Sequence, residues 1–329
     1  MKPNKQLITI DTSKELIEEF LSEVIIAPRS SMRKWALITM QTPAAKLGYI
    51  GQHLASLITG IPGTGTGARG DDLADHTEVK SCNKVDQVDK CKQCGNRVMR
   101  MQTECPVCHS TNIKRNQDSK WLFTIRSEEE LQQYKNMDRV FLLLFDYPNF
   151  AKGDFSDIRI RSFEIYPKEQ RGDVFCTLID YYYHNIYLKK ANDNKKKTNP
   201  MNLHPEMFQF YLCNPVKTFE CIIHNIDTAP RIEINHFILP SEERNTDMQS
   251  ELMPTSSLKP KEIKTLLMKA KFKKEVSPLL NRNITKKQLV AMSVKNILKI
   301  MPYVDERLRS YIPLRSIISV RQKANYQRV

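Results

Sequence analysis

Apolar residues recur at helical spacing near the start of the chain. In SKELIEEFLSEVII (residues 13–26) they lie four residues apart, which predicts a helix. A second helix is predicted over TPAAKLGYIGQHLASLITG (residues 42–60), with Thr42 as its N-cap, Pro43 in its first turn and Gly60 at its end. The pattern therefore predicts a helical N-terminal part.

Short runs rich in Val, Ile, Phe and Leu predict a series of strands further along. The first group is TEVKSC, KWLFTIRS, RVFLLLFDYP and DIRIRSFEIYP, and the second is FQFYLC, FECIIHN and RIEINHFIL. The run from Val140 to Phe145 is apolar throughout, so we expect a strand covered on both faces. Between the groups, CTLIDYYYHNIYLKK predicts a helix and NDNKKKTNP an exposed break.

The last part of the chain returns to helical spacing. PKEIKTLLMKAKF and TKKQLVAMSVKNILKIM are predicted helices, and residues 240–258 are the predicted linker before them. We expect two regions, a core over 1–250 and a helical, basic region over 251–329. The predicted class is α/β, with a mixed central sheet flanked by helices.

Charge indicates the kind of partner. The chain of 329 residues has 51 Lys plus Arg against 37 Asp plus Glu, a net charge of +14 that suits nucleic acid, although a membrane surface would attract it too. No apolar run approaches the roughly 20 residues of a spanning helix, and the start MKPNKQLITIDTSKE lacks the apolar centre of a signal peptide. We expect a soluble, unexported, cytoplasmic protein that is not embedded in a membrane.

Four of the eight cysteines have metal-ligand spacing. Cys91, Cys94, Cys105 and Cys108 form two CxxC pairs separated by ten residues, which predicts a structural Zn²⁺ site with four thiolates and no open position. Replacement of one thiolate by His109 and a redox role for the pairs are the alternatives. The other four are expected to be reduced fillers: Cys82, Cys176, Cys213 and Cys221.

The stretch GDDLADHTEVKS concentrates carboxylates in a basic chain, which is most easily tolerated where a cation binds. On a strand, Glu78 and Lys80 share one face while Val79 points into a core. Glu78 can then hold a divalent cation, and Lys80 can activate water or steady negative charge. An exposed, charged hairpin without chemistry is the alternative. Three further [D/E]xK triplets, at 118–120, 193–195 and 262–264, are expected on the surface.

The second carboxylate of this site is Asp72 or Asp71. Asp72 is favoured because the apolar Leu73 follows it, as expected for an aspartate entering a strand. A two-residue turn at Asp75 and His76 would instead place Asp71 opposite the lysine of the triplet, so the choice depends on register. The preceding stretch GIPGTGTGARG predicts a mobile loop near the site; as a nucleotide-binding loop it would lack the Gly-Lys-Ser/Thr ending.

These residues resemble a known family. GDDLADHTEVKS after a glycine-rich loop is similar to the PD-(D/E)xK core of type II restriction endonucleases, and VDKCKQCG, CPVC and SKWLFTIRS narrow the resemblance to the MamI-like group. It covers roughly residues 46–167 and departs from the motif by having Gly70 or Asp71 in place of the proline. The resemblance implies Mg²⁺-dependent, site-specific cleavage of double-stranded DNA to 5′-phosphate ends. It also implies a homodimer at a palindromic or interrupted palindromic site in a bacterial or archaeal cell.

In this interpretation Asp72 and Glu78 bind Mg²⁺, residues 89–116 form an inserted zinc ribbon, and basic residues contact DNA. The ribbon and the basic C-terminal stretch 307–329 supply most of these cations. The predicted DNA contacts are Arg69, Lys92, Arg97, Arg100, Lys114, Arg115, Arg321, Lys323 and Arg328. Two other functions stay open: a repair or structure-specific nuclease, and a non-catalytic zinc-ribbon DNA-binding protein. The scattered histidines are expected to be structural: His184, His204, His224 and His236.

Overall fold

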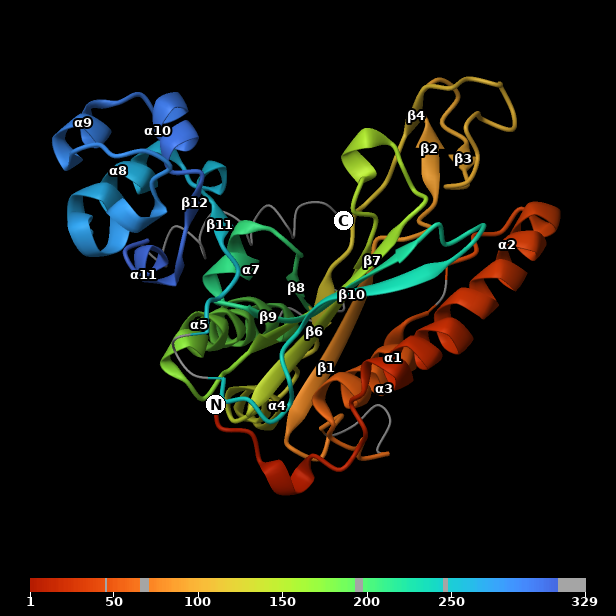
Figure 1. Ribbon diagram of the computed structural model, residues 1–329, viewed down its shortest axis with the longest axis horizontal. Coiled ribbons are helices and arrows are strands. Elements are labelled where there is room, and N and C mark those ends of the chain that lie inside the picture. Colours follow the sequence, from red (N-terminus) through yellow and green to blue (C-terminus); the bar gives the residue numbers. More distant parts are fainter. Residues whose placement is uncertain (45, 66–70, 193–197, 245–247, 313–329) are drawn as a thin grey trace.

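The computed structural model describes residues 1–329 except 45, 66–70, 193–197, 245–247 and 313–329. Its centre is a five-stranded sheet of order β1-β6-β7-β9-β10, in which β1 and β6 are parallel and the other neighbours antiparallel (Figure 1). Its strands are β1 (Thr77–Asn83), β6 (Arg139–Asp146), β7 (Ile158–Ile165), β9 (Val216–His224) and β10 (Arg231–Phe237). The predicted class, a mixed sheet flanked by helices, is confirmed.

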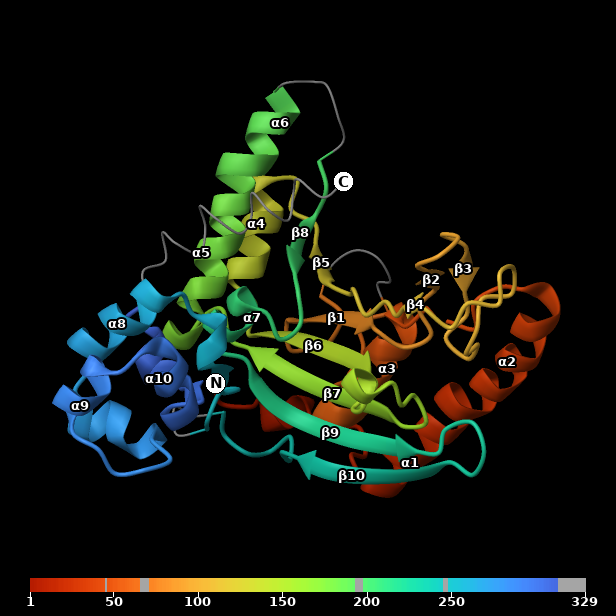
Figure 2. The ribbon, with the colours of Figure 1, turned by 90° about the horizontal axis from the view of Figure 1, so that it is seen from above.

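Strand β6 shows why helices cover both faces of the sheet. All of its residues are buried, as the apolar run predicted, and they alternate between two apolar clusters. Leu142 packs with α4 (Glu128–Lys135) and α5 (Asp173–Tyr182). Phe141 packs with α1 (Lys14–Leu21) and α3 (Gly48–Thr59) on the opposite face (Figure 2).

The N-terminal helices are longer and placed differently than predicted. The helix expected over 13–26 is confirmed, but it continues without a break through Ser22–Ile26 into α2 (Ala27–Thr39). A proline usually ends a helix, so Pro28 concealed this continuation in the sequence; in the structure it directly follows the π-helical turn Ser22–Ile26, and the helix continues past it. The second helix begins at Gly48, not at residue 43, because Thr42 instead donates its hydroxyl to the Asp86 carbonyl at 2.6 Å.

Two other predicted elements were wrong. FQFYLC forms helix α7 (Phe208–Leu212) and not a strand; all five residues are buried, so the stretch shows no periodicity by which to tell the two apart. The helix expected over 285–301 is two helices, α9 (Lys286–Ala291) and α10 (Val294–Ile300). They divide because the Ser293 hydroxyl accepts from the Asn296 N–H at 3.4 Å and starts a new helix.

The predicted zinc-ribbon region (residues 89–116) and the C-terminal helices lie at opposite ends of the molecule (Figure 2). None of the described helices combines the length and apolar character needed to cross a bilayer. Apolar residues of the C-terminal helices share one cluster with those of α5, so the predicted boundary at 250/251 stays a prediction. The remaining elements are β2 (Asp89–Cys91), β3 (Arg97–Val98), β4 (Ile113–Lys114), β5 (Trp121–Phe123), α6 (Leu188–Asn192), β8 (Met201–Leu203), β11 (Met253–Pro254), α8 (Pro260–Lys269), β12 (Tyr303–Val304) and α11 (Glu306–Arg309).

Candidate active site and metal centre

The acidic stretch forms a tight turn that leads into edge strand β1. Leu73 bridges Thr77 across the turn, and the Asp72 N–H donates to the Thr77 carbonyl at 3.0 Å. This pairing leaves three residues, 74–76, in the turn, one more than the two-residue turn considered above, and it directs Asp72 toward the start of β1. Within the turn, His76 adopts a left-handed conformation (φ 58°).

The structure brings Asp72, Glu78 and Lys80 together. The Val79 N–H donates to Asp72 Oδ2 at 2.7 Å, and the Lys80 ammonium donates to Glu78 Oε1. Burial and the neighbouring charge of Glu78 raise the pKa of Asp72 from 3.8 to about 6. A bound cation would stabilise the charge of the Asp72 carboxylate beside Glu78.

Asp71 points to other partners. Its Oδ2 lies 2.6 Å from His76 Nδ1, and its Oδ1 accepts from Gln133 Nε2 at 3.3 Å. The geometry therefore separates the two aspartates: Asp72 faces the triplet, whereas Asp71 faces the turn and helix α4. The assignment of the metal ligand to Asp72 stays a prediction.

Two helices add residues that the sequence did not identify. Gln52 of α3 donates to Asp72 Oδ1 at 2.5 Å, and the Tyr134 hydroxyl of α4 donates to Glu78 Oε1 at 3.4 Å. Burial and the Glu78 charge raise the pKa of Tyr134, so its hydroxyl stays a donor. Gln52 can approach because Gly51 lies against β1: a Cβ at Gly51 would stand 1.8 Å from the Ser81 hydroxyl.

The carboxylate oxygens of Asp72 and Glu78 are ligands that suit Mg²⁺. Among the described residues, the cysteine quartet is the sole group of three or more metal-ligating His, Cys, Asp or Glu side chains. Asp72 and Glu78 would hold a divalent cation through two carboxylates, and Mg²⁺ is typically bound by one or two protein carboxylates together with water and phosphate oxygens. Of the other triplets, Glu262 and Lys264 lie on α8, where residues two apart do not share a face, and residues 193–195 lie outside the described part.

The four thiols of the ribbon converge as their spacing predicted. All four sulfurs lie within 4.8 Å of one another, with Cys91–Cys108 at 3.6 Å and Cys94–Cys105 at 3.5 Å. Sulfurs around one zinc ion at ~2.3 Å stand about 3.8 Å apart, so the quartet fits zinc. His109 is not part of the group; its ring lies 3.4 Å from Glu104.

The cysteines outside the quartet and His224 have structural surroundings. Cys82, Cys213 and Cys221 are free and buried, and Cys176 is half-buried, as expected for fillers. His224 lies between Asp157 and Glu233, at 3.1 and 3.2 Å.

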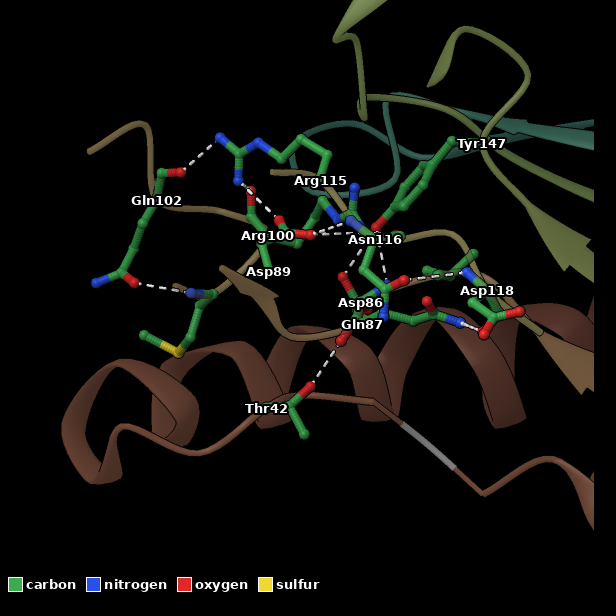
Figure 3. Close-up of polar contacts among 12 residues, drawn as sticks. Thr42, Asp86, Gln87, Asp89, Arg100, Gln102, Arg115, Asn116, Asp118 and Tyr147 are labelled. Atoms are coloured by element: carbon green, nitrogen blue, oxygen red, sulfur yellow. Dashed lines mark hydrogen bonds and ion pairs between the residues drawn. The ribbon is translucent and has the colours of Figure 1, made fainter. Parts of the chain in front are cut away.

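Two predicted DNA contacts, Arg100 and Arg115, belong to the base of the ribbon instead of its surface (Figure 3). Both guanidinium groups contact the buried Asp89 carboxylate, at 3.1 and 2.8 Å, and the Asn116 N–H donates to it at 2.7 Å. Arg100 is 4% exposed and lies over the ring of Phe155, with its guanidinium carbon 4.8 Å from the ring centre. The geometry assigns this pair to holding the ribbon on the core, and contact with DNA stays a prediction for it.

Other predicted DNA contacts are exposed. Arg97 and Lys114 lie directly opposite Lys90 on its two neighbouring strands, which makes a row of three cations across β3-β2-β4. Lys92 is exposed beside the same sheet. Like charges directly opposite one another are unfavourable unless an anion covers them. The remaining predicted contacts lie outside the described residues: Arg69, Arg321, Lys323 and Arg328.

Comparison with known proteins shows which protein family this chain is similar to. The family model described as MamI restriction endonuclease matches residues 34–256. The type II restriction enzyme MamI of Microbacterium ammoniaphilum is 29% identical over 174 residues, which is 52% of this chain and 51% of that enzyme. The chain thus spans about half the length of the curated relative it matches. No solved structure matches the chain. The matched segment contains both the Asp72–Glu78–Lys80 cluster and the cysteine quartet.

Proposed function

Because the chain belongs to the MamI restriction endonuclease family, we propose that it is a type II restriction endonuclease of the cytoplasm, with a PD-(D/E)xK core. Its substrate is double-stranded DNA, which it cuts at a fixed sequence in the presence of Mg²⁺. The observation that carries the proposal is the meeting of Asp72, Glu78 and Lys80 at the start of β1, with the Asp72 pKa raised to about 6.

Each side chain has a role that follows from its place. Asp72 and Glu78 would hold Mg²⁺, which would supply positive charge to stabilise the reacting phosphate. Lys80, beside Glu78, donates to the attacking water or to a phosphate oxygen and stabilises the charge that develops there. Gln52 and Tyr134 hold the two carboxylates in place. From the family resemblance, we expect hydrolysis by water to leave a 5′-phosphate and a 3′-hydroxyl end.

The ribbon gives a second contact with DNA. The exposed row of Arg97, Lys90 and Lys114 matches a run of phosphates, which would remove the repulsion among the three charges. Zinc in the quartet keeps this small sheet folded, and the Asp89 network fixes it to the core.

A homodimer fits the symmetry of the substrate. One active site cuts one strand, so two protomers related by a two-fold axis match a palindromic or interrupted palindromic site. A repair or structure-specific nuclease would use the same residues without a fixed site. A non-catalytic ribbon protein would bind without cutting.

Incubation with a fully sequenced plasmid and Mg²⁺, followed by sequencing of the ends, tests the proposal. We expect discrete fragments with one common sequence at each end. A smear of random ends would instead favour the repair nuclease, and intact but bound plasmid would favour the non-catalytic protein. Glu78→Ala, purified in the same way, is the control for contaminating nucleases.

A further inference from the structure

One buried arginine connects the turn of the candidate active site to the central sheet. Arg139 begins β6 and lies opposite Thr77, the first residue of β1, in the register of the two strands. Its side chain is 4% exposed, so its charge needs partners inside the protein. Nε donates to Thr77 Oγ1 at 3.0 Å, Nη2 to Asp75 Oδ2 at 2.6 Å, and Nη1 to Glu164 Oε1 at 3.3 Å. The three oxygens come from β1, from the turn and from β7.

Two of these contacts hold the turn that carries Asp72. Asp75 lies within the turn, and Thr77 ends it. The Thr77 carbonyl accepts from the N–H groups of Asp72 and Leu73, at 3.0 and 3.2 Å. Because Arg139 binds Asp75 and Thr77 at the same time, it determines where the backbone of Asp72 lies.

The third contact fixes the arginine itself. Glu164 is fully buried on β7, the middle strand of the sheet (Figure 1). Its other oxygen, Oε2, accepts from the Tyr166 hydroxyl at 2.7 Å and from Arg244 Nε at 3.4 Å. Two arginines, 139 and 244, therefore balance the carboxylates of Asp75 and Glu164, and the buried group is neutral as a whole. A neutral, hydrogen-bonded group of this kind is stable where a single buried charge is not.

The turn has few other contacts that could fix its shape. Ala74 and His76 are exposed, and His76 adopts the left-handed conformation, which a residue other than glycine keeps only where its surroundings fix it. Asp75 is 12% exposed, and among the described residues its Oδ1 has no hydrogen-bond partner. The ion pair with Arg139 is thus the interaction that compensates the burial of this carboxylate.

We infer that Asp75 and Arg139 are positioning residues of the active site, which hold the turn so that Asp72 faces Glu78. The inference rests on the proposed function, because it takes Asp72 as a ligand of the metal ion. Lysine could not replace the arginine, since a single ammonium lacks the fork that reaches oxygens on three sides. The three aspartates of the acidic stretch then differ in their tasks: Asp72 binds metal, Asp75 fixes the turn, and Asp71 takes part in neither.

Asp75→Ala tests the inference through the metal dependence of cleavage. In single-turnover reactions with saturating DNA, we expect the rate to fall about 10- to 100-fold and the Mg²⁺ concentration for half-maximal rate to rise about 10-fold, as is typical when the support of a metal ligand is lost. The DNA concentration for half-maximal rate should not change, because the substitution leaves every exposed cation in place. A wild-type rate with wild-type Mg²⁺ dependence contradicts the inference.

Asp227→Ala is the matched control. Asp227 also pairs with two arginines, Arg29 at 3.0 Å and Arg33, and is 24% exposed, but it joins α2 to the turn after β9. This variant should lose stability to urea as Asp75→Ala does, and it should keep the rate and the Mg²⁺ dependence of wild type. If it shows the same change in Mg²⁺ dependence, the cause is a general loss of stability and the inference is overturned.

Hydrogen exchange of the free protein gives a measurement that does not depend on cleavage. The N–H groups of Asp72 and Leu73 donate to the Thr77 carbonyl, and that of Val79 donates to the Asp72 carboxylate. In Asp75→Ala we expect these three to exchange at least ~10-fold faster, while the amides of β6 and β7 keep their rates, because the opening is local. Unchanged exchange at all three positions overturns the inference.

Asp75→Asn serves if Asp75→Ala does not fold, because it keeps the shape of the side chain and an acceptor oxygen for Arg139. We expect the same changes in it, smaller in size, and wild-type exchange together with wild-type metal dependence would contradict the inference. A wild type that cuts no DNA with Mg²⁺ refutes the proposed function, and the exchange rates then decide the inference by themselves. Normal cleavage by wild type with unchanged exchange in the variants refutes the inference alone.

Discussion

Replacing Asp72 with asparagine should stabilise the free protein while it abolishes cleavage. The Asp72 carboxyl has a pKa of about 6 in the folded protein, against its ordinary value of 3.8, because burial and Glu78 disfavour its charge. A carboxyl with a raised folded pKa costs stability once it ionises, so the penalty is absent below about pH 4 and complete above about pH 7. Asparagine carries no charge, and its side-chain oxygen can still accept from the Val79 N–H.

The magnitude follows from the size of the pKa change. For a fully shielded carboxyl the change corresponds to ~3 kcal/mol. Asp72 is half-buried and water screens its charge, so we expect about 1 kcal/mol in favour of Asp72→Asn at pH 7.5 and close to none at pH 4. Urea unfolding at the two pH values, without Mg²⁺, measures the difference. Cleavage with Mg²⁺ should fall at least ~10³-fold.

Asp71→Asn is the matched control, because its carboxylate contacts His76 and Gln133 and not the triplet. It should keep nearly normal cleavage and show no comparable gain in stability. The reasoning is refuted if Asp72→Asn is less stable than wild type at pH 7.5, or if the difference between them is the same at both pH values. If Asp71→Asn abolished cleavage and Asp72→Asn kept it, Asp71 would be the metal ligand.

Three further changes test the ribbon and the tail. Protein purified without chelator should contain about one zinc per chain, and Cys94→Ser should lose it; zinc-free protein with an intact ribbon would contradict the assignment. Asp89→Asn should lower the free energy of unfolding in urea by ~3 kcal/mol, because it leaves Arg100 and Arg115 without their anion. The control is Asp118→Asn, which changes a side chain 75% exposed and should cost almost nothing. Equal effects of the two changes would show that the Asp89 network does not fix the ribbon. The last change replaces three tail cations with alanine: Arg321, Lys323 and Arg328. If they contact phosphates, the slope of log K against log salt should flatten by roughly 2.7, with the same preferred site, and an unchanged slope would assign the tail to another role.

Local patterns predicted the parts of the site that depend on neighbouring residues. The alternation of a strand placed Glu78 and Lys80 on one face, and the CxxC spacing brought the four thiols together. Both need only a few residues of backbone with regular geometry. The strand β6, buried on both faces, was predictable for the same reason, since a continuous apolar run has no polar side to expose.

Contacts between distant segments escaped prediction. Gln52 reaches Asp72 only because Gly51 lets α3 lie against β1, and no local pattern in the helix marks that approach. The sequence predicted Arg100 and Arg115 to be exposed, because charged residues are seldom buried. In the fold both contact Asp89, and Arg100 packs on the ring of Phe155, contacts that no local pattern marks.

Single-turnover cleavage by Lys80→Met tests the central claim most directly. The chain carries its own matched control in Lys264, the lysine of another [D/E]xK triplet, which lies on α8. With Mg²⁺ and a DNA that wild type cuts, Lys80→Met should cleave at least ~10³-fold more slowly, about 4 kcal/mol of barrier, while it binds that DNA normally in Ca²⁺; Lys264→Met should cleave as wild type does. Wild-type cleavage by Lys80→Met, or an equal loss in Lys264→Met, would contradict the account.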